Sequence, residues 1–167
     1  MNFPASTVYT TMMSPLGMII LSATDIGLSG IWFDGQKHLP NYANWQPSSR
    51  NAYLLKAQTS LTAYFAKQTK DLGFAIALDL HTGTVFQQQV WLALLKIPYG
   101  RTVTYSAISQ YMGAPTSVRA VAGAVGRNPI SIMVPCHRVI GSNGTLTGYA
   151  GGLDRKLALL QLEGIAA

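Results

Sequence analysis

The first third of the chain contains three short runs of β-prone residues, and this pattern limits the possible folds more than any other feature. The runs cover residues 8–13, 18–23 and 28–33 and are rich in β-branched, aromatic and large apolar side chains. Two glycine-containing turn segments, residues 14–17 and 25–27, separate them. Strands this close together in sequence pair most simply as an antiparallel meander.

The hydrophobic period changes after the meander. Leu54, Leu61 and Phe65 follow a helical spacing, which predicts one helix, and a further strand is expected over residues 74–80. Strands combined with a helix predict an α+β fold for an N-terminal domain of residues 1–82.

Residues 81–83, His-Thr-Gly, break this pattern and mark the expected domain boundary. In the second domain, residues 83–167, the spacing of apolar side chains and the Pro and Gly positions predict helices over residues 85–95, 105–111, 116–127 and 153–162. Residues 112–115 join the second and third of these through a short glycine-containing link. Two helices joined in this way are typical of a helix-turn-helix.

The expected helix at residues 116–127 has two distinct faces. Its apolar positions are expected to be buried: Val118, Val121, Ala122 and Val125. Arg119, Gly123 and Arg127 lie on another face, which is small and basic. Small residues there allow close approach to a DNA backbone, or equally close packing of helices within the protein.

Composition and charge narrow the function classes. Apolar residues make up 49% of the chain and charged residues only 11%, which is typical of a fully globular protein. The net charge is +6, with seven Lys/Arg against two Asp/Glu after residue 82 and five against four before it. This excess suits nucleic acid, although mild basicity also serves solubility. The longest aliphatic run is too short for a membrane span and no signal segment is present, so we expect no membrane association and a cytoplasmic location, or a nuclear one in a eukaryote.

The only cysteine is Cys136, so an internal disulfide is excluded. The three histidines lack metal-ligand spacing, which predicts no metal. Pro135 restricts Val134 to an extended conformation, and we expect His137 and Arg138 to lower the pKa of the thiol. A lone cysteine is otherwise most often a buried, inert small hydrophobe.

The block Pro-Cys-His-Arg-Val-Ile at residues 135–140 resembles the active-site signature of O6-alkylguanine-DNA alkyltransferases, the methylated-DNA–protein-cysteine methyltransferases. Further motifs match this family in order: Thr104-Tyr105, Arg119-Ala120-Val121, Asn128-Pro129, residues 148–152 and Glu163-Gly164. The match covers residues 84–164, while the N-terminal half resembles the family more loosely. The resemblance implies a ribonuclease-H-like N-terminal domain and a winged helix-turn-helix-like C-terminal domain that carries the cysteine.

The resemblance also implies a reaction. Cys136 would attack the alkyl carbon on guanine O6, and on thymine O4 as well, and keep the alkyl group irreversibly, so that each molecule repairs one lesion. His137 would take the thiol proton through water while Glu163 holds its other ring nitrogen. Asn128 would support the surrounding loops, and Tyr105 would donate its hydroxyl to the guanine or to a phosphate.

The remaining residues implied by the resemblance bind the DNA and the base. Arg119 would fill the space left by a flipped nucleotide. The other DNA contacts would come from Arg101, Thr104, Ala120, Gly123 and Arg127. The guanine pocket would be formed by Val134, Pro135, Val139, Ala150 and, as one wall, Tyr149. The expected partner is double-stranded DNA containing alkylated guanine; no cofactor is expected, and the free protein is expected to be a monomer.

Three other functions compete with this interpretation. A helix-turn-helix regulator explains the basic C-terminal half but does not require Cys136 beside His137, and it would give a sequence-specific footprint. A lesion-recognition module without transfer activity would not need the cysteine. A cysteine hydrolase rarely places nucleophile and base adjacent in sequence, and it would turn over many times.

Overall fold

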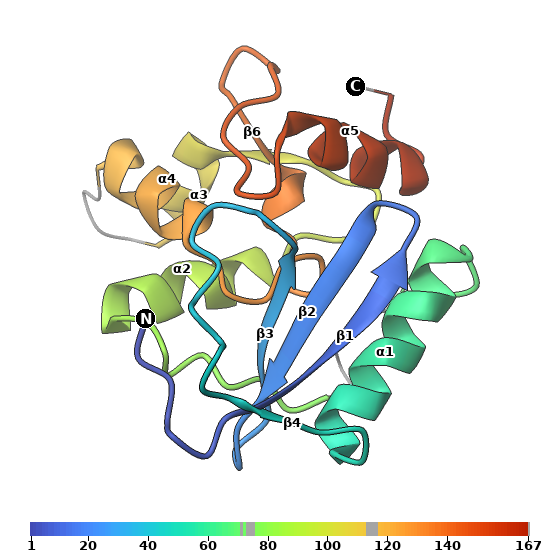
Figure 1. The fold of residues 1–167 in the computed structure, drawn as a ribbon. Helices are drawn as coiled ribbons and strands as arrows, with labels where there is room; N and C mark the ends of the chain where they lie inside the picture. Colours follow the sequence, from blue (N-terminus) through green and yellow to red (C-terminus); the bar gives the residue numbers. More distant parts are fainter. Residues whose placement is uncertain (71, 73–75, 113–116, 167) are drawn as a thin grey trace.

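The computed structural model describes residues 1–70, 72, 76–112 and 117–166 (Figure 1). Its N-terminal half contains a four-stranded sheet in the order β3-β2-β1-β4. The strands are β1 (Val8–Ser14), β2 (Gly17–Ala23), β3 (Leu28–Phe33) and the short β4 (Gln46–Pro47). The first three pair antiparallel in sequence order, which confirms the predicted meander, and β4 runs parallel to β1.

Helix α1 (Ala52–Phe65) packs along the sheet (Figure 1), as its apolar spacing predicts. Asn51 begins the helix by accepting hydrogen bonds from the backbone N–H groups of the second and third helical residues, an ordinary N-cap. The strand expected over residues 74–80 lies partly outside the described residues. Within residues 76–80, Leu78 forms a single bridge with Leu28 rather than a strand.

The C-terminal half is mainly helical. Its elements are α2 (Val85–Leu94), β5 (Val103–Thr104), α3 (Tyr105–Tyr111), α4 (Val118–Gly126), the 3-10 turn η1 (Cys136–Arg138), β6 (Val139–Ile140) and α5 (Leu153–Leu162). Helices α2, α3 and α4 pack on one another, and β5 pairs in parallel with β6. The predicted helices are confirmed, except that residues 113–116, which hold most of the helix-turn-helix link, lie outside the described residues.

Helix α4 differs in detail from its prediction. Val121, Ala124 and Val125 form its buried face, whereas Val118 is 46% exposed. The buried face is set by α2, because the indole N–H of Trp91 donates to the Ala124 carbonyl at 2.9 Å. Val118 lies in the first turn, beyond this contact.

The two halves meet where β3 reaches the segment before Cys136. The N–H of Ile31 donates to the Pro129 carbonyl at 2.9 Å, and the N–H of Ser131 donates back to the Ile31 carbonyl at 3.0 Å. Buried residues of both halves form one continuous hydrophobic cluster. The division near residue 82 stays a prediction.

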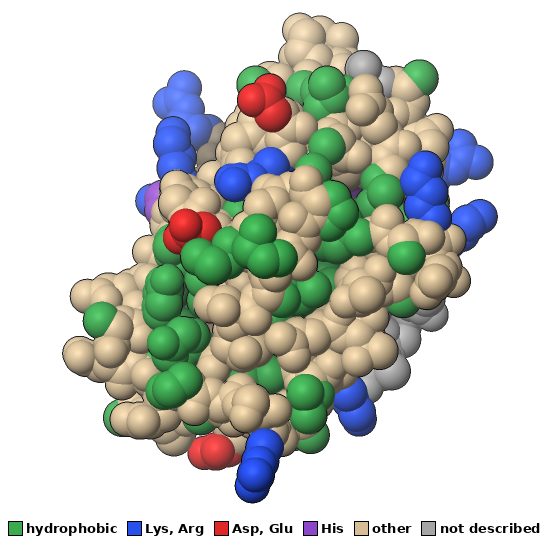
Figure 2. Space-filling model, turned by 45° about the vertical axis from the view of Figure 1, so that its right-hand side comes forward, with side chains coloured by type: hydrophobic (Ala, Val, Ile, Leu, Met, Phe, Trp, Pro, Cys, Tyr) green, Lys and Arg blue, Asp and Glu red, His purple; other side chains and the backbone are tan. Residues whose placement is uncertain are grey.

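Many of the exposed Lys and Arg side chains project from the surface of the molecule (Figure 2). Figure 2 shows Lys and Arg side chains projecting around the face on which α1 lies, with few, separated acidic side chains. In the part of the chain that the structure describes, no helix has both the length and the apolar character that a membrane crossing needs.

Candidate active site

Asn128 anchors the loop that carries Cys136. Its side-chain Nδ2 donates to the Val134 carbonyl at 2.7 Å and to the Cys136 Sγ at 3.0 Å. Its Oδ1 accepts the Ile130 N–H at 3.0 Å. Asn128 is 3% exposed and Cys136 4%, so this network lies inside the protein, and it fixes the thiol relative to the strand-like segment before it.

Burial raises the pKa of the Cys136 thiol to about 11, although the hydrogen bond from Asn128 and the charge of Lys156 act in the opposite direction. The prediction that His137 and Arg138 lower this pKa was therefore wrong. Both side chains are bound to Glu163 instead. A thiol of this kind is protonated at neutral pH and needs a base to become a nucleophile.

Glu163 stands at the end of α5 and collects several hydrogen bonds. His137 Nε2 lies 2.7 Å from its Oε1, and Arg138 donates from Nε to Oε2 at 2.8 Å and from Nη2 to Oε1 at 2.9 Å. The Gly100 N–H also donates to Oε2 at 3.2 Å. Burial alone would raise the pKa of Glu163, but the hydrogen bonds and charges of His137 and Arg138 lower it to about 2. The carboxylate is therefore ionised and only accepts hydrogen bonds.

This carboxylate determines the tautomer of His137. Because Glu163 carries no proton, Nε2 of the imidazole must donate, and Nδ1 keeps its lone pair. Burial lowers the pKa of His137 against the opposing effect of Glu163, so the ring is neutral at physiological pH. Nδ1 is buried and has no hydrogen-bond partner within the described residues. A neutral imidazole with a free lone pair next to Cys136 is suited to accept the thiol proton.

A hollow of about 530 Å³ opens between α4 and the loop of residues 147–150. Tyr105, Arg119, Tyr149 and Ala150 line it from the C-terminal half. Burial raises the pKa values of Tyr105 and Tyr149, so both phenols keep their protons at neutral pH. The hollow is a candidate binding site for a flat group, and the buried Cys136 is not among the residues that line it.

Comparison with known proteins gives the family. The model of the 6-O-methylguanine DNA methyltransferase ribonuclease-like domain matches residues 7–80, and that of the DNA binding domain of the same family matches residues 85–165. The chain belongs to the 6-O-methylguanine DNA methyltransferase family. A methylated-DNA–protein-cysteine methyltransferase of Mycobacterium leprae is 49% identical over 92% of this chain and 90% of its own length. One from Methanosarcina acetivorans is 45% identical over 93% and 97%.

Solved structures of this family have the same fold. Mycobacterium tuberculosis OGT in complex with DNA is 46% identical, with a TM-score of 0.84 over 93% of this chain and 92% of that one. This confirms the predicted α+β fold and its helical C-terminal part.

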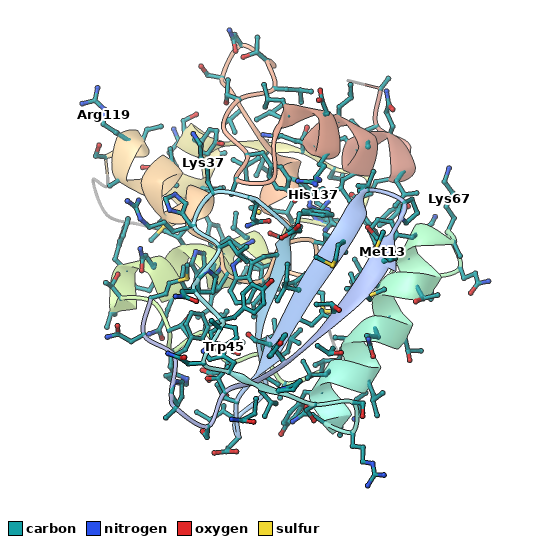
Figure 3. All side chains as sticks on the ribbon, viewed as in Figure 1. Met13, Lys37, Trp45, Lys67, Arg119 and His137 are labelled. Atoms are coloured by element: carbon teal, nitrogen blue, oxygen red, sulfur yellow. The ribbon has the colours of Figure 1, made fainter. Side chains whose placement is uncertain are left out.

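Of the residues expected to bind DNA, Arg119 lines the hollow and the others lie elsewhere on the surface. Arg119 projects from the start of α4 (Figure 3) beside the hollow. Arg127 is exposed and donates to the Gly123 carbonyl at 3.2 Å. Arg101 and Ala120 are exposed but do not line the hollow, and the Thr104 hydroxyl caps α3 by accepting the Ala107 N–H at 3.1 Å.

Only some of the expected pocket residues line the hollow. Tyr149 and Ala150 line the hollow, whereas Val134 and Val139 are fully buried. Pro135 lines a different cavity, together with Tyr99 and Arg138. The Tyr105 hydroxyl donates to the carbonyls of Thr147 and Gly148 at 3.3 and 3.1 Å, so it holds the loop that carries Tyr149.

Lys156 of α5 was missed by the sequence analysis. Its side chain is fully buried, and Nζ donates to the Val139 and Thr147 carbonyls at 2.5 and 2.6 Å. Burial lowers its pKa to about 8. A lysine in an Asp-Arg-Lys run on a helix ordinarily indicates a solvated face, so no signal in the sequence marks it.

Two residues of the N-terminal half were missed as well. Lys37 and His38 are exposed and line the hollow from the opposite side to α4. The Lys37 N–H donates to the Ala150 carbonyl at 3.1 Å, which ties this loop to the loop beside the pocket. Within the described residues, no group of three or more His, Cys, Asp or Glu side chains is placed to hold a metal; the expected absence of a metal stays a prediction.

Proposed function

We propose that this protein repairs O6-alkylguanine in DNA by transferring the alkyl group to Cys136. The observation that carries the proposal is a single buried thiol next to a neutral imidazole whose tautomer is set by an ionised Glu163. The relatives at 45–49% identity are named for transfer from methylated DNA to a protein cysteine. DNA is the partner, as the DNA binding domain and the DNA complex of the M. tuberculosis relative support.

The reaction begins with movement of the Sγ proton toward Nδ1 of His137. The thiolate then attacks the alkyl carbon, so that a C–S bond forms as the C–O6 bond breaks and its electron pair goes to the guanine. Asn128 donates to sulfur as charge develops, and Lys156 favours the thiolate. The Tyr105 hydroxyl would exchange its hydrogen bonds to the Thr147 and Gly148 carbonyls for one to the purine anion, and so stabilise it until the base takes up a proton.

The chemical stability of the product explains why the reaction is stoichiometric. A thioether has no bond that water cleaves under mild conditions, so neither His137 nor Glu163 has a route back to the free thiol. Each protein molecule therefore repairs one lesion. O4-alkylthymine presents the same kind of O-alkyl group, and we include it in the substrate class.

Access to the thiol requires the base to leave the helix. Guanine O6 lies within the stack of a duplex, and Cys136 is only 4% exposed, so the nucleotide must turn out and enter the hollow. Arg119, which projects beside the hollow, would fill the gap in the duplex. Exposed arginines such as Arg101 and Arg127 would contact phosphates, which gives salt-sensitive and nearly sequence-independent binding. The free protein is proposed to be a monomer.

The proposal is tested by the amount of guanine restored. A duplex carrying O6-methylguanine is incubated in excess over the protein, and repaired base is counted against active protein. We expect one guanine per protein molecule and no further turnover, with none for Cys136→Ser. Lesion binding without any restored guanine would instead support a recognition module, and repeated turnover would rule out alkyl storage on the thiol.

A further inference from the structure

The carboxylate of Glu163 has one partner from the N-terminal half that the reaction scheme does not use. Tyr64, in the last turn of α1, is 1% exposed. Its hydroxyl donates to Glu163 Oε1 at 2.8 Å, across 99 positions of sequence. Helix α1 therefore contacts directly the carboxylate that holds His137.

The direction of this hydrogen bond is fixed by the charges of both groups. Glu163, with a pKa of about 2, has no proton to donate. Burial, and then the charge of Glu163, raise the pKa of Tyr64 far above the physiological range, so the phenol keeps its proton. Tyr64 is an obligatory donor, and it shares Oε1 with His137 Nε2 at 2.7 Å and with Arg138 Nη2 at 2.9 Å.

The Tyr64 donor, added to those of His137 and Arg138 on the same oxygen, changes the electrostatic environment of the imidazole. It withdraws negative charge from Oε1 and so weakens the attraction of the carboxylate for an imidazolium. It also restrains rotation of the carboxylate, which keeps Oε1 directed at Nε2.

Other titratable or charged groups face the pair from each element packed around it: Tyr99 from the α2–β5 connection, Cys136 and Arg138 from η1, and Lys156 from α5. Arg138 and Lys156 disfavour an imidazolium through their charges. Tyr64 does so through a neutral hydrogen bond, so its removal leaves the net charge of the site unchanged.

We propose that Tyr64 is a positioning residue for alkyl transfer: its hydroxyl fixes the Glu163 carboxylate toward His137 and keeps the imidazole neutral, ready to accept the proton of Cys136. The consequence for transfer rests on the proposed function. The action on the imidazole does not, and it is measurable in the absence of DNA.

The first experiment follows the ring nitrogens of His137 by NMR as pH is lowered. Tyr64→Phe keeps the ring and its edge-on contact with Tyr99, whose ring centroid lies at 6.3 Å, and deletes only the hydroxyl. We expect the midpoint of protonation of His137 to rise by about one pH unit in this variant. Tyr99→Phe is the matched control, because the Tyr99 hydroxyl donates to the Leu162 carbonyl at 3.2 Å rather than to the carboxylate, and it should leave the midpoint in place.

A second measurement follows alkyl transfer against pH in the same three proteins. The acidic limb of the rate profile should move with the NMR midpoint in Tyr64→Phe, while the plateau rate changes by less than about threefold. A purely structural role of Tyr64 would lower the melting temperature without moving this limb.

A non-natural tyrosine at position 64 tests the proposal if Tyr64→Phe does not fold. 3-Fluorotyrosine at position 64 nearly keeps the shape and makes the hydroxyl a stronger donor, so the midpoint should fall. An unchanged midpoint in Tyr64→Phe, or in the fluorotyrosine protein if Tyr64→Phe is unfolded, overturns the proposal. Failure of the wild-type protein to take up an alkyl group would count against the proposed function instead, because the titration reads His137 directly.

Discussion

Replacing Asn128 by alanine separates the electrostatic support of the thiolate from the support of the loop. The variant loses the Nδ2 donor that lies 3.0 Å from Sγ. A hydrogen bond to a charged group contributes roughly 1.5–3 kcal/mol. We therefore expect alkyl transfer at neutral pH to slow by about 10- to 150-fold, because the thiolate forms less readily.

The same change has a smaller structural cost than the number of hydrogen bonds suggests. The Val134 carbonyl keeps a second donor, the Cys136 N–H at 2.8 Å. The Ile130 N–H loses its acceptor and is buried, which costs roughly 1–3 kcal/mol of unfolding free energy. Asn128→Asp keeps that acceptor but places a buried, unpaired carboxylate against the Val134 carbonyl and sulfur, so it should transfer even more slowly than the alanine variant.

The assay is single-turnover transfer from an O6-methylguanine duplex with protein in excess, together with urea unfolding of each variant. Asn143→Ala is the control, because Asn143 is exposed and its side chain accepts only local hydrogen bonds from Thr145. A folded Asn128→Ala protein that transfers within twofold of the wild-type rate would refute the reasoning, since the bond to sulfur would then contribute nothing to the reactive state.

Three further predictions follow from the site. His137 is already neutral and serves as the base, so the transfer rate should change less than about twofold between pH 6.5 and 8. Attack by a free thiolate would instead give about a 30-fold rise, and rapid-quench rates across this range distinguish the two. Lys37→Ala should reduce the slope of log affinity for DNA against log salt concentration by about one. Lys67→Ala is the control, because Lys67 lies on the far side of the molecule (Figure 3), and it should leave the slope unchanged. Equal slopes for the two variants would show that Lys37 does not contact DNA. The lowered pKa of Glu163 stabilises the fold above pH 4.5, and this contribution is lost as pH falls toward 2. Glu163→Gln should therefore lower the free energy of unfolding by about 3–5 kcal/mol at pH 7, because it leaves Arg138 unpaired. The difference in unfolding free energy from the wild-type protein should shrink in acid. A difference that stays constant with pH in denaturant unfolding would contradict this.

Local patterns predicted the three long strands and the helices, but not the short strands β4, β5 and β6, and residues 76–80 form a single bridge where a strand was expected. Alternating and turn-forming residues predicted the three-stranded meander, and helical spacing with a terminal Gly or Pro predicted α1, α2, α3 and α5. The buried face of α4 was partly wrong, because the position of Trp91 on α2, and not the period alone, sets which side of α4 is covered.

The chemistry of the site depended on contacts between distant residues. The sequence motif identified Cys136, His137 and Arg138, but the side chains of His137 and Arg138 bind Glu163, which lies 26 and 25 positions further along the chain. Adjacency in sequence therefore gave the wrong direction for the thiol pKa. Lys156 and Tyr64 were missed for the same reason, because their role follows from burial against partners that no local pattern indicates.

The most direct test of the account is the intact mass of the protein after incubation with duplex DNA carrying O6-methylguanine, followed by peptide mapping. The account predicts a gain of one methyl group per lesion consumed, located on Cys136, in a protein that reacts once. An unchanged mass with the lesion bound, or a methyl group on any other residue, would contradict it.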